Sequence, residues 1–123
     1  SVRELFFIVL LSLVIWAEFA LVYQVGLWAM GESPSFWVGM TVNVIIALII
    51  AVPSAPGFIG TFQLGCFTAL TGIYLYPEEF SLAYSVVNHG LQFVTTIVAG
   101  LFVLKREGLR FDDLVRSQEL EAR

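Results

Sequence analysis

Charge is the property this sequence has least of. Charged residues make up 13% of its 123 residues, against about 25% in an average soluble domain, while 59% are hydrophobic. No Lys or Arg occurs between positions 5 and 104, and the only charged residues there are Glu18, Glu32, Glu78 and Glu79. A soluble protein could not cover its surface with so few charges. The composition therefore predicts an integral membrane protein.

Cysteine and histidine are also nearly missing. Cys66 is the only cysteine, so an intrachain disulfide is excluded, and the single His89 excludes a histidine-rich metal site. The sequence contains neither a phosphate-binding P-loop nor a G-x-G-x-x-G fingerprint. Its basic residues are too few to line a nucleic-acid groove. We expect no catalytic residue, no metal, no cofactor and no nucleic-acid partner.

What the sequence has instead is long apolar stretches. They predict an all-α, polytopic membrane helix bundle with segments at about 5–30, 36–52, 57–76 and 80–104. A crossing helix needs about 20 residues, which the first and last segments clearly provide. The composition changes at Lys105, and 105–123 is predicted to be a cytoplasmic juxtamembrane tail. That tail is either a solvated helix or a docking element for a partner.

The basic residues predict the orientation in the membrane. All six lie at the chain ends, before the first apolar segment or after the last, and the turns at Glu32 and Glu78-Glu79 have none. Positive charge is retained in the cytoplasm, so both termini should be cytoplasmic and both acidic turns external. Four crossings fit this arrangement. Two crossings also fit, with 36–52 and 57–76 forming a re-entrant pair.

The segment 53–63 interrupts the apolar sequence. Its two prolines cannot continue a helix, and Pro56 is followed by Gly57 and Gly60, which permit unusual backbone dihedrals. If a helix begins near Gly57, its amides could hold an anion such as a lipid phosphate. A backbone break inside lipid must be buried in protein or must line a wet cavity. The plainer interpretation is a tight turn between two spans.

Glu18 is the most unusual single residue. It lies near the middle of the first apolar segment, where a carboxylate costs about 2.5–3.5 kcal/mol. We expect it to face the interior of the bundle. There it would contact a substrate or a proton, or it would be a protonated carboxyl bonded to another helix.

Polar residues also form a stripe on the last apolar segment. The residues that share one helical face are Ser81, Ser85, Asn88, Gln92 and Thr95, and His89 flanks that face. His89 lies at a depth in the membrane similar to that of Glu18, so a contact between the two is possible. These side chains could contact a ligand or hydrogen-bond between helices. Small residues form a comparable stripe on 57–76, which predicts an inner helix of the bundle. The small residues are Gly57, Thr61, Gly65, Thr68 and Gly72.

The residues of the break resemble a known family. Positions 53–63 read Pro-Ser-Ala-Pro-Gly-Phe-Ile-Gly-Thr-Phe-Gln, similar to the P-x-x-P-G-G-x-G-x-x-E stretch of the lysylphosphatidylglycerol synthase transmembrane region, whose members are flippase-like. Trp16-Ala17-Glu18 resembles a Trp- and Glu-containing pattern upstream, and 100–114 is similar to the family's C-terminal helix and basic end. Two positions differ. Phe58 replaces the second glycine, and Gln63 replaces the acid.

The resemblance implies a lipid-translocating membrane domain and not an enzyme, because the synthase activity of the best understood branch lies in a separate soluble domain. Membrane lipids would be its partners, with further transmembrane helices of a longer chain or a homo-oligomer completing it. The residues expected to bind the headgroup are Glu18, Pro56, Gly57, Gly60, Gln63, Asn88, His89 and Gln92. The alternative is a membrane anchor that holds a partner enzyme through 105–123.

Overall fold

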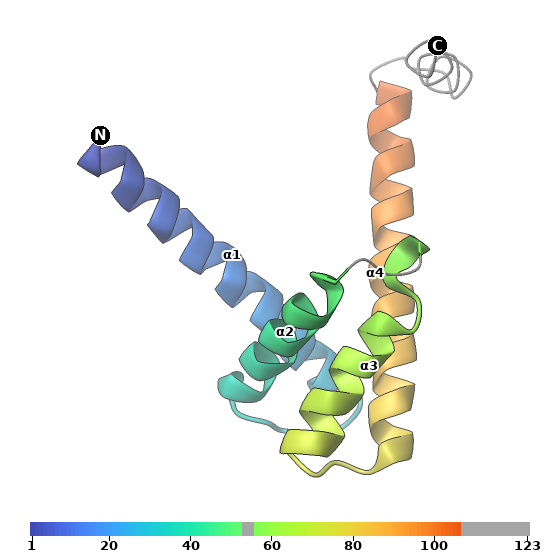
Figure 1. Ribbon diagram of the computed structural model, residues 1–123. Helices are drawn as coiled ribbons and strands as arrows, with labels where there is room; N and C mark the ends of the chain where they lie inside the picture. The colour runs from blue at the N-terminus through green and yellow to red at the C-terminus, as the bar shows by residue number, and fades with distance from the viewer. Residues whose placement is uncertain (53–55, 107–123) are drawn as a thin grey trace. The chain divides into compact units, whose positions relative to one another are not determined.

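A computed structural model describes residues 1–52 and 56–106. Within these ranges all regular structure is helical, in the order α1, α2, η1, α3, η2 and α4 (Figure 1). The prediction of an all-α membrane helix bundle is therefore confirmed. Of the predicted tail, only Lys105 and Arg106 belong to the described residues. Pro53, Ser54 and Ala55 of the break also lie outside the described residues.

Two helices are long enough to cross a membrane. They are α1 (Val2–Ala29), with 28 residues, and α4 (Glu78–Arg106), with 29. Ser1 caps α1, since its hydroxyl accepts from the Glu4 N–H at 3.4 Å and its amino group pairs with the Glu4 carboxylate. Helix α4 has acids in its first turn and bases in its last, which suits the helix dipole.

The helices between them are short. Helix α2 (Phe36–Ile50) has 15 residues, about 22 Å at 1.5 Å per residue, which is less than the hydrocarbon thickness of about 30 Å. After it come η1 (Pro56–Phe58), α3 (Thr61–Phe67, 7 residues) and the π-helical η2 (Thr68–Ile73, 6 residues). Within the predicted segment 57–76, the consecutive helical residues are therefore fewer, 61–73. The left-handed residues of the break delay the regular helix until Thr61.

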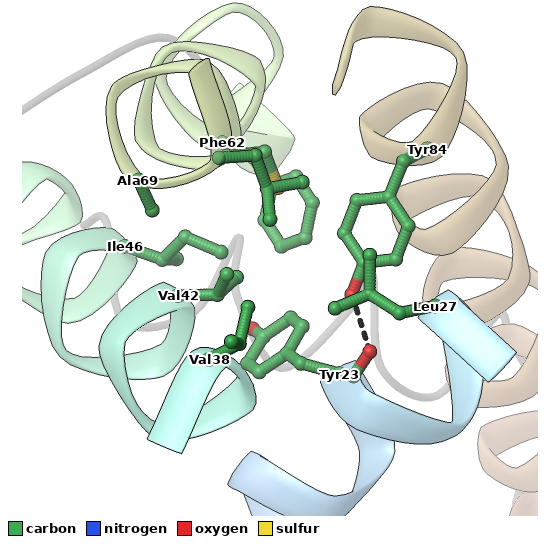
Figure 2. Close-up of a cluster of buried hydrophobic side chains, with 10 residues drawn as sticks. Tyr23, Leu27, Val38, Val42, Ile46, Phe62, Ala69 and Tyr84 are labelled. Atoms are coloured by element: carbon green, nitrogen blue, oxygen red, sulfur yellow. Dashed lines mark hydrogen bonds between the residues drawn. The ribbon is translucent and has the colours of Figure 1, made fainter. Parts of the chain in front are cut away.

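The core lies in the compact unit formed by Ser1–His89. Helix α2 packs against α1 and α3, and buried side chains from all of these helices and from the start of α4 meet in one cluster (Figure 2). We call these residues the core cluster: Tyr23, Leu27, Val38, Val42, Ile46, Phe62, Cys66, Ala69, Leu70 and Tyr84.

Small residues allow the helices of this unit to approach closely. Gly39 of α2 lies against α1, where an added Cβ would overlap the Ala20 carbonyl oxygen. A Cβ on Gly65 of α3 would lie 2.8 Å from Ile46 Cγ1 of α2. Gly65 is therefore an inner-helix residue, as its stripe predicted, whereas Gly72 of the same stripe is exposed. Close packing of this kind is the main attraction between helices in lipid.

The chain divides at His89, within α4, and a second unit begins at Gly90. In the first unit, α4 buries Ser81, Tyr84, Ser85 and Asn88. Three of these belong to the predicted polar stripe, so its first half faces the core. In the second unit, the hydroxyls of Thr95 and Thr96 donate to the carbonyls of Leu91 and Gln92, one turn earlier in their own helix.

Candidate functional site

The backbone break between α2 and α3 has three described residues with positive φ. They are Gly57 at 72°, Phe58 at 56° and Gly60 at 90°. Every described residue from Pro56 to Gly60 is exposed. The Thr61 hydroxyl donates to the Phe58 carbonyl at 2.9 Å, which fixes the entry into α3. The break lies where the sequence predicted it, and the structure adds that its described residues are exposed.

Gln63 connects the break to α4. Its Oε1 atom accepts a hydrogen bond from the Gly60 N–H at 2.8 Å, and its Nε2 atom lies 3.2 Å from Nδ1 of His89. One half-buried carboxamide therefore joins the backbone of the break to the histidine. The Gly60 amide is engaged inside the chain, so the phosphate contact predicted for it requires Gln63 to move away.

His89 is held by two neighbouring residues of α3. Its ring stacks on Phe62 with 4.4 Å between ring centroids and 16° between planes, while Gln63 occupies Nδ1. Phe62 was not predicted as a site residue, because nothing in the sequence distinguished it from the other aromatic residues of the apolar segments. The possible contact of His89 with Glu18 is not what the structure shows, since Gln63 and Phe62 lie against His89 and Glu18 is exposed.

Asn88, the residue before His89, belongs to a different network. Its Nδ2 donates to the Tyr84 hydroxyl at 2.9 Å, and that hydroxyl donates to the Tyr23 carbonyl of α1 at 2.7 Å (Figure 2 shows the second bond). Asn88 is buried and lies close to Gly26 of α1. The bond of Asn88 to Tyr84 lies within α4, and Tyr84 provides the hydrogen bond to α1. Tyr84 was missed, although it lies one turn before Asn88.

Glu18 does not face the core of this chain. The buried residues of α1 are Ala20, Tyr23, Gln24 and Leu27, and Glu18 is exposed. With 100° of rotation per residue, Glu18 falls on the opposite side of the helix from Ala20 and Leu27. The expectation that Glu18 faces the bundle interior is therefore wrong for the described chain. Its carboxylate projects from an apolar, exposed face of α1.

The structure thus brings together Gly60, Gln63 and His89, with Asn88 next in sequence. Glu18 lies apart from them, and Gln92 belongs to the unit that begins at Gly90. Among residues 1–52 and 56–106, no group of three or more His, Cys, Asp or Glu side chains could hold a metal ion. The chemistry available at the break is hydrogen bonding, ring stacking and proton uptake by one imidazole.

The comparisons with known proteins identify one family. The family described as the lysylphosphatidylglycerol synthase TM region matches residues 1–100. No curated protein and no solved structure matches the chain. The matched range includes α1, α2, the break and most of α4. The family that the residues of the break resemble is therefore confirmed. The chain belongs to the family of the lysylphosphatidylglycerol synthase transmembrane region.

Proposed function

We propose that this membrane domain moves a phospholipid or a lipid-linked headgroup across the cytoplasmic membrane. The observation that carries the proposal is the accessible backbone of Pro56–Gly60 beside the Gln63–His89 pair. Irregular backbone at membrane depth must be buried in protein or line a water-filled cavity, and the described residues of the break are exposed in this chain. Membership of a family of membrane domains with lipid-related roles supports the same conclusion.

The helix lengths support a topology in which the break lies inside the bilayer. Helices α1 and α4 would cross with both termini in the cytoplasm, as the positions of the basic residues favour. Helix α2 has 15 residues, and α3 and η2 together are shorter still, so neither arm is long enough to cross upright. We therefore favour the re-entrant pair over four crossings. In that pair, Pro56–Gly60 forms the tip.

In this proposal the tip binds the headgroup while the acyl chains stay in lipid. Pro56 and Gly57 keep the backbone out of a helix, and Gln63 and His89 supply hydrogen bonds. Glu18 would contact the headgroup from the lipid-facing side of α1, and Gln92 would contact it further along α4. Asn88 would act by holding α4 against α1 through Tyr84. No covalent chemistry is required, so the domain itself would not be an enzyme.

The test is lipid transfer in liposomes that contain the purified protein and phosphatidylglycerol with a fluorescent headgroup label. Dithionite added outside quenches only the outer leaflet, so the second quenching phase measures translocation. We expect His89→Phe and Gln63→Ala each to slow that phase by about tenfold, the effect of about 1.4 kcal/mol of lost hydrogen bonding. Val86→Ala, at an exposed position one turn before His89 and Gly90, is the matched control and should leave the rate unchanged.

The proposal is contradicted if Glu18→Ala and His89→Ala together leave the translocation rate unchanged in a folded protein. The anchor hypothesis makes a different prediction. It expects no protein-dependent quenching phase in the unmutated protein, together with recovery of a partner enzyme that is lost when 107–123 is deleted.

A further inference from the structure

The hydrogen bonds around Gln63 determine which ring nitrogen of His89 carries the proton. A backbone N–H can only donate, so the Gln63 atom that lies 2.8 Å from the Gly60 nitrogen must be the oxygen, Oε1. The amide nitrogen of Gln63 then faces His89 Nδ1 at 3.2 Å. An amide nitrogen also only donates, so Nδ1 must accept. His89 is therefore the neutral tautomer with its proton on Nε2.

This arrangement fails when His89 takes up a proton. Both ring nitrogens of an imidazolium are donors, so Nδ1–H would face the NH2 group of Gln63, a contact of two donors. A half-turn of the Gln63 carboxamide brings Oε1 to Nδ1–H and removes the conflict. The same turn places NH2 against the Gly60 N–H, which then loses its acceptor. We propose that protonation of His89 turns the Gln63 carboxamide and releases the Gly60 N–H at the break.

Among the described residues, the buried core beside His89 contributes no charged side chain. The titratable side chains of the core cluster are Tyr23, Cys66 and Tyr84, which are uncharged near neutral pH. The other charged side chains of these helices are exposed: Arg3 and Glu4 on α1, and Glu78, Glu79, Lys105 and Arg106 on α4. Helix α2 carries no titratable side chain. Glu18, the charged residue in the middle of α1, is exposed. Histidine is the side chain whose charge ordinarily changes between pH 5 and 8.

His89 is thus a positioning residue that acts on the break through Gln63. Ring stacking on Phe62 holds the imidazole in place in both protonation states, so the carboxamide is the part that turns. The released N–H lies in the exposed turn before α3, where a polar group of a ligand or water could replace Gln63. The switch concerns the chain's own residues and holds whether or not the domain moves lipid.

The test is nuclear magnetic resonance of the full chain in lipid nanodiscs with 15N-labelled histidine and glycine. His89 is the only histidine, so its ring nitrogens are observed without overlap. Above the titration midpoint we expect the ring shifts of the Nε2–H tautomer. As the pH falls, the Gly60 amide resonance should shift with the same midpoint as His89. The amide of Gly72, an exposed glycine further along the same segment, is the control and should not follow that midpoint.

Two variants separate the switch from simple packing. His89→Phe keeps a ring that stacks on Phe62 and should abolish the pH response of Gly60. Gln63→Glu supplies a carboxylate that accepts from both Gly60 and His89 without turning, so the Gly60 response should become small. The Nδ1–H tautomer in neutral His89, or a Gly60 response that persists in His89→Phe, would overturn the proposal.

Discussion

The core cluster and the break both depend on glycine, but for different reasons. In the core, Gly39 and Gly65 are small so that helices can touch, and no side chain would fit without moving backbone. In the break, Gly57 and Gly60 supply left-handed dihedrals in an exposed turn, and a Cβ on Gly60 would meet nothing within 4 Å. A substitution of a core glycine should therefore destabilise the protein by adding volume. A substitution of a break glycine should do so by straining the backbone.

The hydrogen bonds of the two regions differ in the same way. The Tyr84 hydroxyl donates to the Tyr23 carbonyl and accepts from Asn88 in a fully buried setting. The Gln63 carboxamide connects an exposed amide to a titratable ring. The first network is buried and links α4 to α1, while one proton on His89 would rearrange the second. The buried network thus suits a fixed core, and the exposed one suits a rearrangement at the break.

The largest effect should come from adding volume to the core. Gly39→Ala places a Cβ against the Ala20 carbonyl oxygen, so α1 and α2 must separate, and we expect a loss of about 2–3 kcal/mol of unfolding free energy. Gly72→Ala adds the same methyl group where nothing lies within 4 Å and should change stability little. Unfolding by SDS titration in mixed micelles measures both. Equal effects of the two substitutions would contradict the close helix contact at Gly39.

A smaller loss is expected when the core network is cut without a change of volume. Tyr84→Phe removes the donor to the Tyr23 carbonyl and the acceptor of Asn88, and we expect a loss of about 1–1.7 kcal/mol, near the upper end for hydrogen bonds between membrane helices. Tyr74→Phe removes an exposed hydroxyl bonded to Thr41 and should cost less. The same SDS titration tests the order, and a larger loss in Tyr74→Phe would contradict it.

The smallest effect, with the opposite sign, should come from the break. Phe58 adopts a φ of 56°, a conformation that costs a residue with a Cβ roughly 1–2 kcal/mol relative to glycine. Phe58→Gly should therefore stabilise the protein by about 1 kcal/mol after the entropy cost of glycine is subtracted. Ile59→Gly removes a neighbouring exposed apolar side chain that has no positive φ, and it should not stabilise the protein. Stabilisation in both variants would show that the backbone conformation of Phe58 is not the cause.

The sequence alone predicted those features that depend on composition and period. Runs of apolar residues predicted α1 and α4, and the spacing of polar residues predicted the buried face that Ser81, Ser85 and Asn88 present. The Pro/Gly cluster predicted the position of the break. Even the missing glycine at position 58 is informative, since the structure places that residue in the region that glycine prefers.

What the sequence did not predict depends on tertiary contacts. Helix α1 is strongly apolar along its length, and its apolar residues lie on every side of the helix. No periodic pattern therefore indicated which face Glu18 would occupy. In the sequence, Phe62 and Tyr84 look like any other aromatic residues of the apolar segments. Only the structure shows that Phe62 stacks on His89 and that Tyr84 donates to the Tyr23 carbonyl. The start of α3 at Thr61 depends on the dihedrals of Phe58 and Gly60, which composition does not determine.

The burial of Cys66 has a practical consequence for mapping this membrane protein. The only thiol of the sequence lies in the core cluster with no exposed surface, so membrane-impermeant maleimides should not label the unmodified chain. An engineered Ile59→Cys, at a position that is 68% exposed, can then be probed without first replacing the native cysteine. Labelling from one side of the membrane would show which aqueous compartment reaches the break. No labelling from either side would show that neither compartment does.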